Sequence, residues 1–188
     1  MCGVFLSAEL PVGMKESIKD LEFEASRLLA LQNFKKAEQI YDNIFTQIYE
    51  RQFIENRRIH QGAPLHMKGI SLLFQNKFKE ALLNFVLAYI TDTVNYPVGE
   101  ENNADRAPAH YILKEYYNVS EDTFNIIKNQ SKNIYINRIQ PFNPQKFLHS
   151  VLLILHIDED KILKIAARIP NKDEISTLMI QFLYVFSL

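Results

Sequence analysis

The chain has 188 residues, of which 47% are hydrophobic and 23% are charged, with a formal net charge of -1. This balance is typical of a globular protein with one folding unit, and 5 Gly with 7 Pro leave little room for a loop-rich β fold. A net charge so close to zero provides no overall field to attract nucleic acid or an anionic membrane surface.

The N-terminal sequence and the cysteine count indicate a reducing compartment. Cys2 is the single cysteine, so neither an intramolecular disulfide nor a cysteine-based zinc site can form. The opening MCGVFLSAEL lacks the positive segment and the long apolar segment of a secretory signal. No uninterrupted apolar run approaches the roughly 20 residues that a spanning helix needs. We therefore expect a cytoplasmic protein without a membrane span.

The first part of the chain has the apolar spacing of a helical hairpin. Apolar residues recur at intervals of three or four, which places them on one face of a helix. The polar pair Gln32-Asn33 then marks a turn, and a second helix with the same spacing starts at Phe34 and runs to about Asn56. The first helix has its apolar stripe at Ile18, Leu21, Ala25 and Leu28.

A second hairpin repeats this pattern forty-four residues later. It opens at Gly62-Ala63-Pro64, where proline suits the first turn of a helix. A turn at Gln75-Asn76-Lys77 leads into a helix that starts at Phe78. A self-similar period of this kind is typical of stacked units that complete their apolar faces on their neighbours.

The two hairpins resemble the tetratricopeptide repeat family. The second meets six consensus positions, and the first meets five, with Ile44 where the family has its last alanine. The resemblance covers about residues 18–93. It departs from the family at the charged residues Glu24 and Lys68 and in its spacing, which is ten residues longer than thirty-four. The matching residues are Leu65, Gly69, Leu72, Ala81, Phe85 and Ala88 in the second hairpin, and Leu21, Ala25, Leu28, Ala37 and Tyr41 in the first.

The resemblance implies an all-α fold of antiparallel helical hairpins, an α-α superhelix, that binds proteins or peptides without chemistry of its own. The family lines its binding groove with the first helix of each hairpin. Members that clamp a terminal carboxylate have Lys and Asn at the middle positions, which this chain lacks. An apolar groove for an amphipathic helix is expected instead, and the alternative is that another part of the chain fills it. By position, the groove residues are Lys19, Glu22, Ser26 and Leu29, followed by Ala63, His66, Ile70 and Leu73.

The rest of the chain is predicted to form a helical extension, so that residues 1–13 are a tail, 14–93 the two hairpins, 94–106 a polar loop and 107–188 the extension. Ala109 to Tyr116 predicts a short helix, and Ser120 can cap another, so these two can form a degenerate third repeat or a cap. Helices are also expected from Asn143 and from Asp158. The closing stretch ISTLMIQFLYVFSL either packs into the core or continues into a longer natural protein.

The sequence predicts no catalytic residue, cofactor or metal ion. Residues 1–5, MCGVF, are similar to the start of class II amidotransferases, but that fold is rich in strands. The five histidines show no i, i+4 pair and no HExxH pattern, and no glycine-rich phosphate loop can be assembled.

Two alternatives remain open beside a scaffold or interaction module. One is the regulatory or sensor part of a longer effector enzyme that is cut short at its C-terminus. The other is weak RNA binding, because no acidic residue lies between Asp122 and Asp158. A solvated connector is the simpler interpretation of that region, and homo-oligomers are compatible with the sequence. The basic residues in the region are Lys128, Lys132, Arg138 and Lys146.

Overall fold

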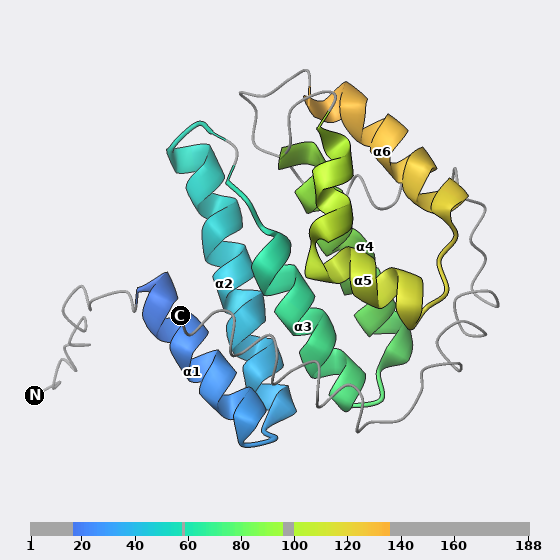
Figure 1. Ribbon diagram of the computed structural model, residues 1–188. Coiled ribbons are helices and arrows are strands. Elements are labelled where there is room, and N and C mark those ends of the chain that lie inside the picture. Colours follow the sequence, from blue (N-terminus) through green and yellow to red (C-terminus); the bar gives the residue numbers. More distant parts are fainter. Residues whose placement is uncertain (1–16, 58, 96–99, 136–188) are drawn as a thin grey trace, which may run out of the picture.

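The computed structural model describes residues 17–57, 59–95 and 100–135, and every regular element in these ranges is a helix (Figure 1). The all-α prediction is confirmed for this part of the chain. The elements are α1 (Ile18–Ala30), α2 (Phe34–Ile54), α3 (Gly62–Phe74), α4 (Phe78–Asn95), the 3₁₀ helix η1 (Glu101–Arg106), α5 (Pro108–Glu115) and α6 (Glu121–Tyr135).

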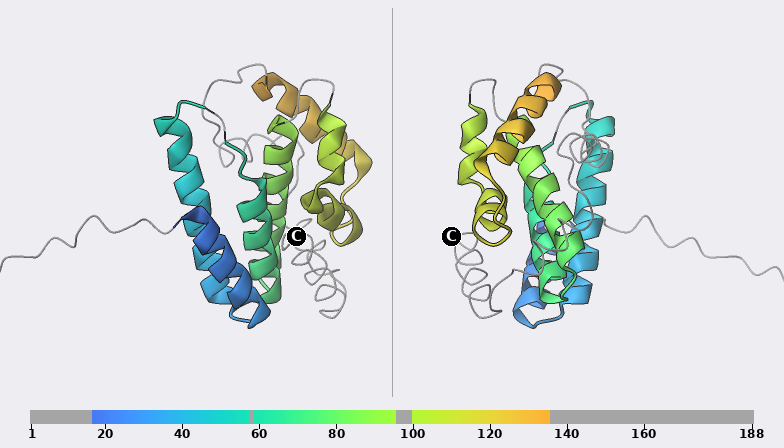
Figure 2. Two further views of the ribbon diagram at one scale, coloured as in Figure 1. Left: turned by 60° about the vertical axis from the view of Figure 1, so that its left-hand side comes forward. Right: turned by 90° about the vertical axis from the view of Figure 1, so that its right-hand side faces the viewer.

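The first four helices pack in chain order, each against the one before it, and α5 and α6 pack against α4. Figure 1 shows α1 at one edge of the molecule and α6 at the other, and both views in Figure 2 show α5 and α6 on the side of α4 that faces away from α2. The described structure is therefore a row of helices, with α1 at one end and the α5–α6 pair at the other.

The predicted turns of both hairpins and the predicted start of the second are confirmed, whereas the first helix begins at Ile18 and not at the predicted residue 14. Helix α1 begins at a capping box, in which the Ser17 hydroxyl accepts from the Asp20 N–H at 3.2 Å. Helix α2 ends at Ile54, two residues before the predicted end, which confirms the unusually long second helix.

Both hairpin turns have the same hydrogen bonds. The N–H of Asn33 donates to the carbonyl of Leu28 at 2.8 Å, and forty-four residues later the N–H of Lys77 donates to that of Leu72 at 3.0 Å. The residue before each donor has a left-handed backbone, with φ of 59° at Gln32 and 61° at Asn76. This is the Schellman motif, which ends a helix by satisfying its last carbonyls.

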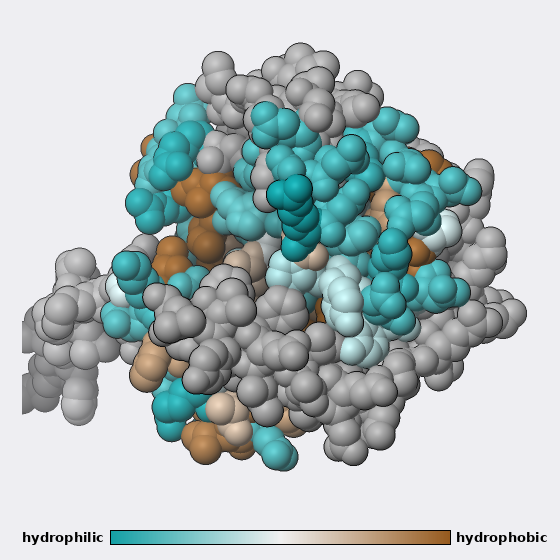
Figure 3. Space-filling view, viewed as in Figure 1, coloured by the Kyte–Doolittle hydropathy of each residue, from teal (hydrophilic) through white to brown (hydrophobic). Residues whose placement is uncertain are grey.

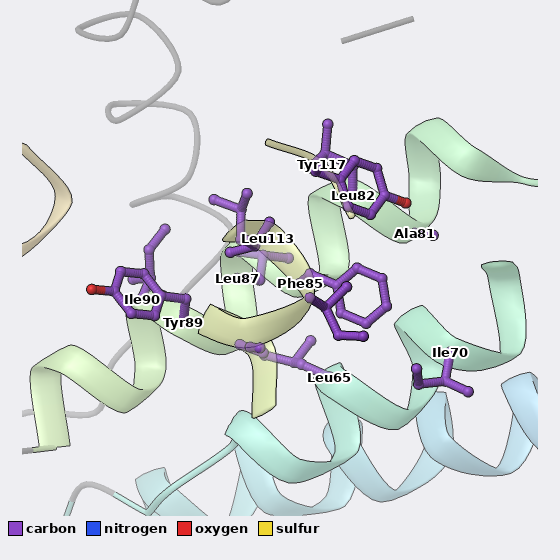
Figure 4. Close-up of a cluster of buried hydrophobic side chains, with 14 of the residues drawn as sticks. Leu65, Ile70, Ala81, Leu82, Phe85, Leu87, Tyr89, Ile90, Leu113 and Tyr117 are labelled. Atoms are coloured by element: carbon purple, nitrogen blue, oxygen red, sulfur yellow. The ribbon is translucent and has the colours of Figure 1, made fainter. Parts of the chain in front are cut away.

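Two hydrophobic clusters form the core. Fully buried small residues, Ala25 and Ala37 in the first hairpin and Ala81 in the second, let the paired helices approach closely. Figure 4 shows Leu65, Phe85 and Leu113, which come from α3, α4 and α5, gathered in the larger cluster. The smaller cluster joins α1 to α2 and consists of Leu21, Ala25, Leu28, Leu29, Ala37, Tyr41, Ile44 and Ile48.

The structure differs from the prediction between residues 94 and 106. Helix α4 continues to Asn95, and η1 occupies Glu101–Arg106 in the segment predicted as a polar loop. Ala104 is fully buried in the larger cluster, which explains why this polar segment is ordered against α4. The predicted helices at Ala109 and Ser120 are confirmed as α5 and α6. The predicted tail at residues 1–13 and the elements predicted beyond residue 135 lie outside the described residues.

Candidate functional site

The groove residues predicted on α1 lie partly at the surface. Lys19 and Glu22 are exposed, Ser26 is partly buried and Leu29 is buried in the smaller cluster. The Ser26 hydroxyl lies 3.3 Å from the Tyr41 hydroxyl on α2. Desolvation raises the pKa of the Glu22 carboxyl, and the nearby Lys19 ammonium opposes this shift. The accessible part of the predicted groove on α1 is thus polar.

The groove residues predicted on α3 are mostly covered. Ala63 is exposed, whereas His66, Ile70 and Leu73 are buried, the last two in the larger cluster. The His66 ring lies 5.4 Å from the Phe85 ring, and burial lowers its pKa to about 4. A partner therefore reaches Lys19, Glu22 and Ala63 without rearrangement, and reaches the apolar members only if the chain uncovers them.

Several large apolar side chains lie at the surface, among them Phe53, which the apolar spacing assigns to the stripe of the long second helix. Phe23 on α1 is 74% exposed and lies at i+4 from Lys19. Phe53 and Ile54 are exposed at the end of α2, where Figure 3 shows hydrophobic surface. The exposure of Phe23 could have been predicted from the three-four spacing, since this spacing places Phe23 opposite the buried stripe of α1.

A histidine and a carboxylate meet at the start of α3. The His60 Nε2 lies 2.6 Å from Asp92 Oδ1, which α4 places there. The backbone at Gly62 passes so close that a β carbon would lie 2.4 Å from Asp92 Oδ1. A side chain at this position would therefore have to displace the Asp92 and His60 side chains. The carboxylate lies at the positive end of α3, whose N-cap residue Gln61 makes no capping hydrogen bond through its side chain.

The two hairpins differ at this site in two respects. The residue equivalent to Asp92 is Ile48, which is buried, and the residue equivalent to Gln61 is the capping Ser17. Burial raises the pKa of the Asp92 carboxyl, and the hydrogen bond from His60 opposes the shift. The Asp92 carboxylate can orient the His60 imidazole. Within the described residues, no group of three or more His, Cys, Asp or Glu could hold a metal ion.

A polar cluster centred on Asp105 joins four elements. The Tyr89 hydroxyl of α4 donates to Asp105 Oδ1 at 2.7 Å, and the Lys128 Nζ of α6 lies 2.9 Å from Oδ2. Lys128 also donates to Asn102 Oδ1 at 3.0 Å. The His110 Nε2 of α5 lies 3.8 Å from Asp105 Oδ1. We call these five residues the Asp105 cluster.

Electrostatics favours the ionised form of Asp105 in this cluster. Partial burial opposes ionisation, but the hydrogen bonds from Tyr89 and Lys128 outweigh it and hold the pKa of Asp105 below its ordinary value. Desolvation lowers the pKa of His110, although the Asp105 charge opposes that shift. Lys128 is only 7% exposed. It therefore holds α6 against η1. The RNA-binding alternative requires the Lys128 charge to be accessible to a polyanion, and in this position it is not.

Comparison of the chain with protein-family models, with curated proteins and with solved structures finds no match. None of the described helices combines the length and the apolar character needed to cross a membrane.

Proposed function

We propose that this protein is a non-catalytic interaction or scaffold module of the tetratricopeptide repeat type, which binds a protein or peptide in the cytoplasm. The observation that carries this proposal is the correspondence of the two hairpins. Helices α1 and α3 begin and end forty-four residues apart, at Ile18 and Gly62 and at Ala30 and Phe74, and α2 and α4 begin at Phe34 and Phe78.

Local chemistry supports a common origin for this correspondence. The left-handed residues Gln32 and Asn76 and their hydrogen bonds have the same offset as the helices. The left-handed region costs conformational energy for residues other than glycine. Its use at two matched positions therefore supports a common origin of the two hairpins. Stacked hairpins of this kind present an extended face formed by successive first helices, and repeat proteins bind their partners on that face.

The accessible groove residues favour a partner that makes polar contacts. Lys19 and Glu22 are exposed on α1, and Ala63 is exposed at the equivalent of Lys19 on α3. Opposite charges one helical turn apart can select a partner with the reverse arrangement. The covered residues Ile70 and Leu73 add an apolar floor where binding uncovers them.

A charge-reversal experiment tests this proposal. Three intact chains serve as bait: wild type, a groove variant and a control variant. The groove variant carries Lys19→Glu with Glu22→Lys, and the control variant carries Lys35→Glu with Glu50→Lys. The proteins captured by each chain are quantified by mass spectrometry. The control pair is exposed on α2 and keeps the same net charge. We expect a specific set of proteins to be lost with the groove variant and kept with the control. Equal capture by all three chains would contradict the proposed face.

A further inference from the structure

Helix α6 is attached to the rest of the protein through few buried side chains. Figure 1 shows it at the edge of the molecule. Among the side chains of α6 that the structure describes, Phe124 and Ile127 are the buried apolar ones. The Ser131 hydroxyl lies 2.8 Å from the Thr93 hydroxyl of α4, and Lys128 belongs to the Asp105 cluster. Elements with little buried apolar surface open locally at a lower free energy than the core of a domain.

The ring of His110 on α5 contacts both the apolar and the ionic attachment of α6. Its centroid lies 4.4 Å from that of Phe124 and 5.6 Å from that of Tyr89. Its Nε2 atom lies 3.8 Å from Asp105 Oδ1, which is beyond hydrogen-bond distance, and is buried without a hydrogen-bond partner among the described residues. An imidazolium donates from both ring nitrogens, so this position suits the neutral ring and not the charged one.

The charges that face His110 are already balanced. The two carboxylates are paired with the two lysines at 2.9 Å and 2.5 Å, and both ion pairs join α6 to another element. A proton on His110 therefore adds an unbalanced positive charge. Desolvation outweighs the attraction of the carboxylates and holds the pKa of His110 below its ordinary value. The titratable groups around the ring are Tyr89 of α4, Asp105 of η1, Lys114 of α5, and Glu121 and Lys128 of α6.

We propose that His110 is a pH-sensitive latch for α6: when its imidazole takes up a proton, α6 separates from α4 and the ring becomes hydrated. Separation removes Phe124 from the ring and gives water access to Nε2, so the added charge is solvated in the open state. Opening also uncovers the apolar side of α6 and the surface of α4 beneath it. The ordinary pKa of histidine is 6.5, so opening becomes more favourable as the pH falls below 6.5. The latch concerns α6 and does not depend on the proposed function, which rests on α1 and α3.

Hydrogen exchange of the full chain, measured by mass spectrometry at pH 7.5 and pH 5.5, tests the latch. The observed rates are corrected for the pH dependence of intrinsic amide exchange. We expect the opening equilibrium constant of α6 to rise by about three- to tenfold at the lower pH, where tenfold is the limit for one proton over one pH unit below 6.5. A rise of less than about twofold in wild type would overturn the proposal.

Two single variants assign the titrating group. His110→Gln keeps a polar side chain but takes up no proton in this range, so the change in α6 should disappear. His66→Phe removes the imidazole that is buried between α3 and α4, and it should keep the change in α6. Circular dichroism checks that both variants fold. An equal rise in His110→Gln, or loss of the rise in His66→Phe, would overturn the role of His110.

A disulfide between α4 and α6 tests whether the two helices have to separate, with His110 in place. Thr93 Oγ1 and Ser131 Oγ lie 2.8 Å apart, so cysteines at these positions are within disulfide reach. Thr93→Cys with Ser131→Cys is prepared in a Cys2→Ser background, and its oxidised and reduced forms are compared by hydrogen exchange. We expect the acid-induced rise in the reduced form and none in the oxidised form. An equal rise in both forms would contradict the proposed separation.

Discussion

The ring of Phe85 on α4 lies directly against the backbone of Gly69 on α3. A β carbon at residue 69 would lie 2.7 Å from Phe85 Cε1 and 2.9 Å from Cδ1, closer than packed carbon atoms approach. The equivalent residues of the first hairpin are Ala25 and Tyr41, both buried. The second hairpin therefore pairs a ring with the smallest residue, and this contact fixes how closely α3 and α4 approach.

Replacing Gly69 by valine should destabilise the protein. The new side chain would displace the Phe85 ring from the larger cluster, and overpacking of this kind costs about 1 to 3 kcal/mol. Chemical denaturation of wild type and Gly69→Val measures the effect. The same substitution in a Phe85→Leu background should cost less, because the smaller side chain leaves room for valine. Equal costs in both backgrounds would show that the contact does not limit the packing.

The stability of the protein should fall with pH through His66. Its pKa is lowered from 6.5 to about 4 because the ring is fully desolvated. Between these values the unfolded chain takes up a proton that the folded chain does not, so stability falls as pH falls below 6.5 and the loss is complete near pH 4. At about 1.4 kcal/mol per pKa unit, the total is about 3 kcal/mol.

A variant without the titrating ring isolates this contribution. His66→Phe keeps a planar ring beside Phe85 but cannot bind a proton. Urea denaturation of both chains from pH 7.5 to pH 4.5 should give a difference in stability that shifts in favour of the variant as pH falls. Parallel pH profiles of the two chains would contradict the predicted role of His66.

The hairpins could be predicted because their determinants are local in the sequence. The apolar stripe from Leu21 to Leu28 and the polar turns specify each helix to within a few residues, and the structure confirms the helices and the turns between them. What the stripe could not specify is which other surfaces cover a helix. His66 and Ile70 are at positions that the resemblance predicted to line a groove, yet both are buried here.

The Asp105 cluster could not be predicted for a different reason. Its members come from four elements and have no regular spacing, and Asp105 itself lies in a segment whose composition indicates a loop. The sequence shows that Lys128 belongs to a basic segment, but it does not show that this side chain is buried. The position of α6 against α4 decides its environment, and that position depends on packing over the whole chain.

Replacing Asp92 by asparagine should leave the protein as stable as wild type or more stable at neutral pH. The pKa of Asp92 is raised by burial, so the fold favours its neutral form, and the charge becomes unfavourable as pH rises above 3.8. Asparagine keeps the shape and can still hydrogen-bond to His60. We expect a gain between zero and about 1 kcal/mol at pH 7, which should disappear below pH 3.8 in denaturation experiments.

His60→Ala is the matched test of the same pair. It removes the hydrogen bond and leaves the buried Asp92 carboxylate without this partner, which should cost about 1 to 3 kcal/mol at pH 7. In the Asp92→Asn background the cost should be smaller, because no buried charge remains. A larger cost in that background would show that the carboxylate is not the group that His60 stabilises.

The two partners at the centre of the Asp105 cluster should have unequal effects when each is removed alone. The Lys128 side chain is 9% exposed and that of Asp105 is 28% exposed. Asp105→Asn leaves the more deeply buried charge without its counter-ion and should cost about 3 kcal/mol. Lys128→Met leaves a carboxylate that water can still reach and that still accepts a hydrogen bond from Tyr89, so this variant should lose about 1 to 2 kcal/mol of stability.

The double variant tests the coupling between the two residues. Because each single variant leaves the other charge without its counter-ion, the double variant should lose less stability than the two single variants combined. We expect the difference to exceed the roughly 0.5 kcal/mol scatter of independent sites. Denaturation of the four chains measures this coupling, and additive costs would mean that α6 is held in place by its apolar contacts rather than by the Lys128–Asp105 pair.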